Sequence, residues 1–132
     1  MRKTIKNNRE ALHQMRKIYY PLGKEYIDWM GFRITEENKP SYHHIEKAED
    51  LRRKHESDIA TVENGAYLGK KSHELLHKIE KIDKNLYIMW NQLFQIINET
   101  KQYPSDDLLI EVYTLQSLSI DLCKKNKKTL KL

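Results

Sequence analysis

The sequence predicts a small α+β protein that is mostly helical and contains one two-stranded hairpin. Apolar residues recur at three- and four-residue spacing along most of the 132 residues, which is the pattern of amphipathic helices. Two short runs, 41–45 and 66–68, read as the strands of the hairpin, with the turn-forming pair Asn64-Gly65 before the second, and a further short strand is predicted over 32–34. The length and the 39% hydrophobic content suit one modest core, so residues 1–132 are predicted to form a single domain.

The N-terminal part, residues 9–31, is predicted to be helical. Asn8 can cap a first helix, which Pro21 then ends or interrupts. A second helical stretch is predicted over Leu22–Met30, with Gly31 as its C-terminal stop. The aromatic and aliphatic stripes of both stretches are interpreted as core, because side chains at helical spacing usually pack inward.

The C-terminal part, residues 83–123, is predicted to form two longer helices. Asp83 and Ser105 are suitable N-terminal caps. Trp90 and Phe94 lie in the broad apolar stripe of the first of these helices, where they could serve the core or a dimer face. Residues 124–132 form a basic tail.

The net charge of +5 comes from the two ends of the chain. Of 24 basic residues, nine lie in residues 1–9 and 124–132, which leaves 15 basic against 19 acidic residues between them, a net charge of about −4. The tails could add affinity for phosphate backbones, but charge alone does not identify a partner.

No sequence feature points to a membrane or to disulfide bonds. No run approaches the eighteen or so apolar residues that span a bilayer, and the first residues lack the apolar segment of a signal peptide. Cys123 is the single cysteine, so an intramolecular disulfide is excluded, and its position on a helix favours a core role. A cytoplasmic protein is expected.

Histidines concentrate in the central part of the chain. His43 and His44 end the first predicted strand, and His73 and His77 lie four residues apart on the helix predicted over Ser72–Ile82. Residues four apart share a helix face, so these two rings can reach one metal ion. A third ligand can come from the strand, where neighbouring side chains point to opposite sides and only one of the pair can ligate easily.

The order His-His, then Asn64, then His-x3-His resembles the HNH nucleases, most closely the colicin-type DNases. The resemblance covers residues 41–82 and implies a ββα-metal core made of a hairpin and a helix. It implies that His43, His73 and His77 bind one divalent ion, zinc, magnesium, manganese or nickel. It further implies that His44 is the general base, that Asn64 orients it, and that the reaction is phosphodiester hydrolysis, in DNA. The flanking helices look like those of small phage or prophage proteins. Arg52, Arg53 and Lys54, in a charged loop over 46–57, could contact the nucleic-acid backbone.

Two other functions fit parts of the pattern. A phage-encoded protein could keep the fold and the metal without catalysis and bind a host protein or nucleic acid. Alternatively, His73-Glu74-Leu75-Leu76-His77 matches the zinc metalloprotease motif, in which Glu74 would be the base and Glu99 a third ligand. The protease interpretation leaves His43, His44 and Asn64 without a role.

Overall fold

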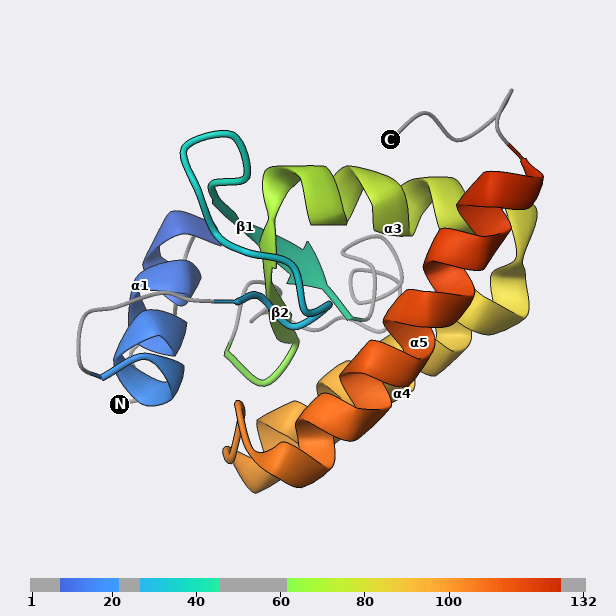
Figure 1. Ribbon diagram of the computed structural model, residues 1–132. Coiled ribbons are helices and arrows are strands. Elements are labelled where there is room, and N and C mark those ends of the chain that lie inside the picture. Colours follow the sequence, from blue (N-terminus) through green and yellow to red (C-terminus); the bar gives the residue numbers. More distant parts are fainter. Residues whose placement is uncertain (1–7, 22–26, 46–61, 127–132) are drawn as a thin grey trace, which may run out of the picture.

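The described part of the chain is α+β and mostly helical, with one two-stranded antiparallel sheet, as the sequence predicts. A computed structural model describes residues 8–21, 27–45 and 62–126. Its elements are α1 (Asn8–Tyr19), β1 (Pro40–His44), β2 (Gly65–Gly69), α3 (Lys70–Ile82), α4 (Lys84–Thr100) and α5 (Asp106–Lys125) (Figure 1). None of the described helices is both long and apolar enough to cross a membrane.

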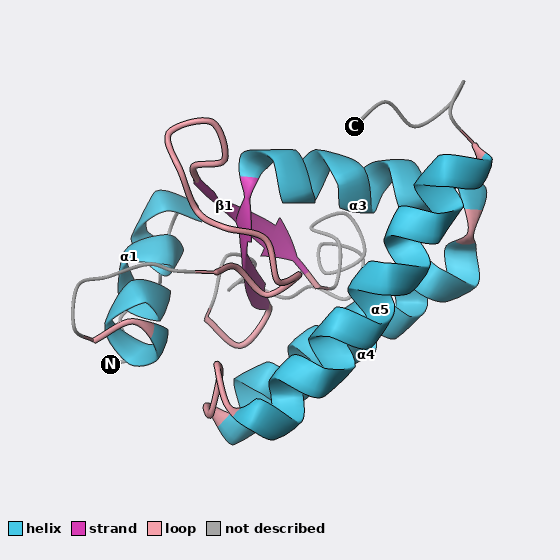
Figure 2. Cartoon of the chain, in the orientation of Figure 1, coloured by secondary structure: helices cyan, strands magenta, loops and turns pink. Residues whose placement is uncertain are grey.

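The small sheet lies between the helices (Figure 2). β1 and β2 pair in register from Pro40 opposite Gly69 to His44 opposite Gly65, and β2 continues directly into α3. α1 contacts both strands, and α3 and α4 also pack on them. Side chains alternate along a strand, so one face of β1 can meet α1 while the other meets α3 and α4.

A side chain distant in sequence supports the start of α3. Gly69, the N-cap residue that precedes α3, has no side chain to cap the helix. Instead, Asn38 Oδ1 accepts hydrogen bonds from the backbone N–H of Lys71 at 2.9 Å and of Ser72 at 3.4 Å. Asn38 Nδ2 also donates to the carbonyl of Arg33 at 2.8 Å. A Cβ at Gly69 would lie 2.1 Å from Asn38 Oδ1, so this close approach requires glycine. The first turn of α3 is thereby held against the loop that precedes β1.

α4 and α5 form an antiparallel pair that supplies much of the core. The predicted caps are confirmed: Asp83 accepts from the N–H of Leu86 at 3.1 Å, and Ser105 accepts from the N–H of Leu108 at 3.4 Å. Trp90 and Phe94 are fully buried within the chain, so they serve the core. Cys123 is also buried, as predicted for a core residue.

The helix predicted over Leu22–Met30 is wrong in its described part. Residues 22–26 lie outside the described residues, and Ile27 forms an isolated bridge with Arg33 instead of a helical turn. The carboxylate of buried Asp28 explains the difference, because its Oδ1 accepts from the N–H of Met30 and of Phe32, both at 3.0 Å. This local bonding favours a turn, which Gly31 completes with a φ of +83°. Among the described apolar residues of this stretch, Trp29 and Met30 are nevertheless buried and Ile27 packs against the core, as expected.

Candidate metal centre

β1 presents two different faces to the rest of the protein. The rings of Tyr42 and His44 contact each other edge to face, with centroids 4.7 Å apart. Ser41 and His43 lie on the other face, toward α3, where Ser41 bonds His73 and the His43 ring lies 5.2 Å from the His73 ring. His43 is only 2% exposed. The structure therefore separates the two adjacent histidines, as strand geometry predicts.

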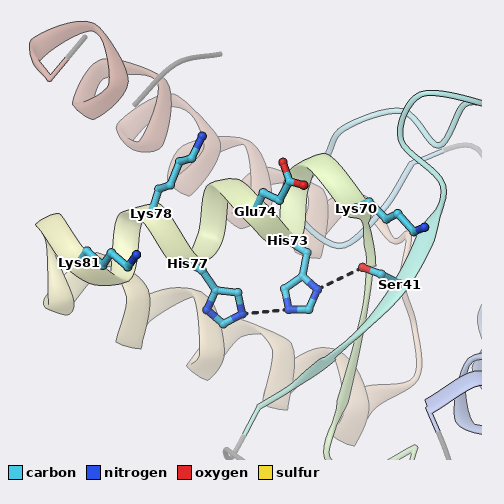
Figure 3. Close-up of a pocket in the computed structure, with 7 residues that line it drawn as sticks. All are labelled: Ser41, Lys70, His73, Glu74, His77, Lys78 and Lys81. Carbon is cyan, nitrogen blue, oxygen red and sulfur yellow. Dashed lines mark hydrogen bonds between the residues drawn. The ribbon is translucent and has the colours of Figure 1, made fainter. Parts of the chain in front are cut away.

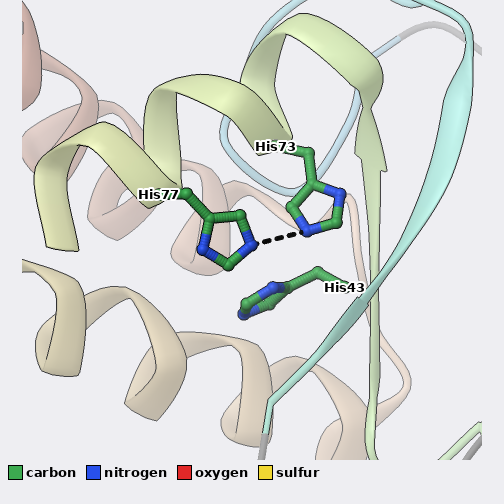
Figure 4. A group of neighbouring side chains, drawn as sticks. All are labelled: His43, His73 and His77. Carbon is green, nitrogen blue, oxygen red and sulfur yellow. Dashed lines mark hydrogen bonds between the residues drawn. The ribbon is translucent and has the colours of Figure 1, made fainter. Parts of the chain in front are cut away.

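His73 and His77 face each other along α3. Their Nε2 atoms are 3.0 Å apart, and Nδ1 of His73 lies 3.2 Å from Ser41 Oγ (Figure 3). The ring of His43 approaches both from β1, with centroids 5.2 and 5.6 Å away (Figure 4). One nitrogen of each ring lies within 4.8 Å of the others, which brings the three imidazoles close enough to bind one metal ion.

Each of the three imidazoles has a hydrogen-bond partner on its other nitrogen. Asn91 Oδ1 lies 2.8 Å from His43 Nε2, and Glu80 Oε1 lies 3.1 Å from His77 Nδ1. Both oxygens can only accept, so these ring nitrogens carry the hydrogens. In neutral rings, His43 Nδ1 and His77 Nε2 then hold lone pairs. Such outer partners are typical of metal-binding histidines, whose tautomer and orientation they fix.

The hydroxyl of Ser41 determines the state of His73. Ser41 Oγ donates its single hydrogen to the carbonyl of Leu68 at 3.2 Å, so it accepts the hydrogen of His73 Nδ1. His73 Nε2 then carries a lone pair 3.0 Å from His77 Nε2, which donates a hydrogen bond to it in a protonated His77 and presents a second lone pair in a neutral one. Two facing lone pairs repel unless a proton or a cation lies between or beside them. Two nitrogens bound to one tetrahedral zinc ion lie about 3.3 Å apart, close to this separation.

Burial keeps two of the three imidazoles in the metal-binding form. Burial is the largest cause that lowers the pKa of His43 to about 3; the hydrogen bond that His43 donates to Asn91 opposes this shift, and the charges of His73, His77 and His44 add to it. Burial likewise lowers the pKa of His73 to about 4, with contributions from His77 and His44. Neutral imidazole is the form that ligates metals, so both rings are available as ligands at neutral pH.

A pocket of about 460 Å³ opens on the α3 side of the cluster. Its lining consists of two of the clustered histidines, the hydroxyl that binds one of them, and four charged residues of α3: Ser41, Lys70, His73, Glu74, His77, Lys78 and Lys81. His43 is not part of this lining. The cluster thus has a closed side at β1 and α4 and an open side along α3.

The other predicted site residues lie in different positions. His44 is half-buried on the opposite face of β1, and Asn64 is next to it across the sheet, because the N–H of Ile45 donates to the Asn64 carbonyl at 2.8 Å. Arg52, Arg53 and Lys54 lie outside the described residues. Glu99 is exposed near the end of α4 and is not in the metal-binding group of the described residues, whereas Glu74 lines the pocket.

Sequence reasoning missed the outer partners of the cluster. Glu80 follows His77 by three residues, a helical spacing that could have revealed it. Asn91 carries no such signal, because only the packing of α4 beside α3 brings it to His43.

Comparison of the chain with protein-family models, curated proteins and solved structures found no match.

Proposed function

We propose that this protein is a metal-dependent endonuclease of HNH type that hydrolyses phosphodiester bonds in DNA. The observation that carries the proposal is the convergence of three imidazoles, since one ring nitrogen each of His43, His73 and His77 lies within 4.8 Å of the others, and the Nε2 atoms of His73 and His77 are 3.0 Å apart. The cluster also spans an antiparallel strand pair followed directly by a helix, the arrangement expected of a ββα-metal core.

His43, His73 and His77 would hold the ion, through Nδ1 of His43 and Nε2 of the other two. Three imidazoles favour zinc, nickel or another first-row ion over magnesium, which prefers oxygen ligands. A bound ion would bind a phosphate oxygen and stabilise the charge that develops on the leaving oxygen. The open pocket along α3 gives a substrate access to this side of the cluster.

In this proposal His44 is the general base and Asn64 orients it. His44 follows His43 directly on β1 but lies on the opposite face of the strand, and its charge contributes to the lowered pKa of His43 and of His73. The hydrogen bond between Ile45 and the Asn64 carbonyl fixes the end of the strand pair beside His44. The imidazole of His44 would take a proton from the water that attacks phosphorus.

Plasmid cleavage tests the function. Protein stripped with chelator is incubated with supercoiled DNA and zinc, nickel, manganese or magnesium. We expect nicking with a first-row ion, its loss in His73→Ala, and a loss of at least 100-fold in His44→Ala, while Glu74→Gln keeps the activity. Metal binding without cleavage under any condition would reject the nuclease and favour a metal-containing binding protein.

Peptide hydrolysis is the second candidate, and one observation favours it: Glu74 lines the pocket beside His73 and His77. In that case Glu74 would be the base and His43 would replace the expected ligand Glu99. Casein digestion that depends on Glu74 and is indifferent to His44→Ala would support this reaction. We expect no such digestion.

A further inference from the structure

Three lysines line the same pocket as the partly buried His73 and His77. Lys70, Lys78 and Lys81 all belong to α3, and the only acidic residue of the pocket lining is Glu74. Within the described part of the chain, none of the three lysines forms an ion pair, whereas the carboxylate of Glu80 is bound to His77. The pocket therefore has an excess of positive charge available to a ligand.

The lysines lie on both sides of the metal-binding histidines along the helix axis. Figure 3 shows Lys70 at one end of the pocket and Lys78 and Lys81 toward the other, with His73 and His77 between them. At a rise of 1.5 Å per residue, Lys70 and Lys78 are separated by about 12 Å and the row spans about 16 Å. One strand of duplex DNA advances about 3.4 Å per nucleotide, so the row matches the length of roughly five nucleotides.

We propose that Lys70, Lys78 and Lys81 form a binding track for the phosphate backbone of a nucleic acid. A strand bound by Lys70 on one side and by Lys78 and Lys81 on the other would hold a phosphate against His73 and His77. This assignment describes how the proposed nuclease would bind its substrate. It rests on the proposed function, because that function identifies the bound polymer as DNA. It assigns the backbone contact to α3, whereas Arg52, Arg53 and Lys54, for which this contact was predicted, lie outside the described residues.

The test is binding of a fluorescent 20-base-pair duplex to the metal-free protein, measured by anisotropy at several salt concentrations. The variant K70Q/K78Q/K81Q is compared with R9Q/K17Q/K84Q, which removes the same charge from exposed positions on α1 and at the start of α4. Glutamine and lysine have similar helix propensities, so both variants should fold. A third variant, K70R/K78R/K81R, keeps the charge.

We expect the track variant to lose at least tenfold in affinity at 0.1 M salt. The slope of log affinity against log salt should become shallower by up to about 2.7, because each phosphate contact contributes about 0.9. The control and the arginine variants should bind like the wild type. Equal affinity and slope for the track and control variants would overturn the proposal, as would binding to anionic phospholipid vesicles without binding to the duplex.

The duplex-binding and plasmid-cleavage assays together distinguish a wrong lysine track from a wrong nuclease assignment. If the wild type binds the duplex through the three lysines but never cleaves it, the track stands and the catalytic proposal falls. If the wild type nicks plasmid and the track variant binds and cleaves equally well, the track is wrong and the nuclease stands. Zinc affinity should be the same in all variants, since no metal ligand is changed.

Discussion

Asn91 on α4 binds the buried ring of His43 on β1, with 2.8 Å between Asn91 Oδ1 and His43 Nε2. This bond joins the C-terminal helices to the histidine cluster and fixes the tautomer of its most deeply buried imidazole. His43 therefore keeps its Nδ1 lone pair toward His73 and His77. The two long C-terminal helices accordingly do more than complete the core, because one of them orients a histidine of the cluster.

Replacing Asn91 with alanine should weaken metal binding about 10- to 100-fold, because the His43 ring would lose the partner that sets its tautomer. Competition with a chromophoric chelator measures the affinity for zinc. Asn91→Asp should retain most of the affinity, since a carboxylate can accept the same hydrogen. Gln92→Ala, an exposed change on the same helix, is the matched control. Equal losses in Asn91→Ala and Gln92→Ala would contradict a positioning role.

The metal-free protein should lose stability as the pH falls from about 6.5 toward 4. Unfolded histidines take up protons near pH 6.5, whereas the pKa of His43 is lowered to about 3 and that of His73 to about 4 in the folded state. The unfolded state then binds more protons in this window, so acid favours unfolding. For His43 alone, the free energy of unfolding should fall by about 2 kcal/mol between pH 7 and pH 5.

Urea unfolding in chelator at pH 7, 6 and 5 measures this dependence. His43→Leu should flatten it, and His13→Gln, a change on the exposed side of α1, should leave it unchanged. An unchanged pH dependence in His43→Leu would show that the buried imidazole does not control acid stability.

Asn38→Ala should lower the free energy of unfolding by about 1–2 kcal/mol. The substitution leaves the N–H of Lys71 without its hydrogen-bond partner at the start of α3 and removes the bond to Arg33. Thermal and urea unfolding check the value, with exposed Asn85→Ala on α4 as control. Because His73 follows this first turn, zinc affinity should also fall. A loss no larger than that of Asn85→Ala would mean that Asn38 is not a cap.

Local patterns in the sequence were sufficient to predict most of the elements. Asp83 and Ser105 are caps whose partners lie three residues away, and His73 and His77 are neighbours on one helix, so short-range spacing predicted them. Asn38, Asp28 and Asn91 act across long sequence separations, and nothing in their local sequence indicates those partners. The predicted helix over Leu22–Met30 was wrong in its described part because the Asp28 carboxylate accepts from the N–H of Met30 and of Phe32. Asp28 bonds its own loop and also accepts from the N–H of Gly69 at 2.9 Å.

The most direct test of the metal centre is imidazole NMR of the ¹⁵N-labelled protein during zinc titration. One equivalent of zinc should shift the ring signals of His43, His73 and His77 together. The shifts should mark Nδ1 of His43 and Nε2 of the other two as the bound atoms, while His13 remains unchanged. Saturation with zinc that leaves the His43 ring unaffected would contradict the three-histidine site.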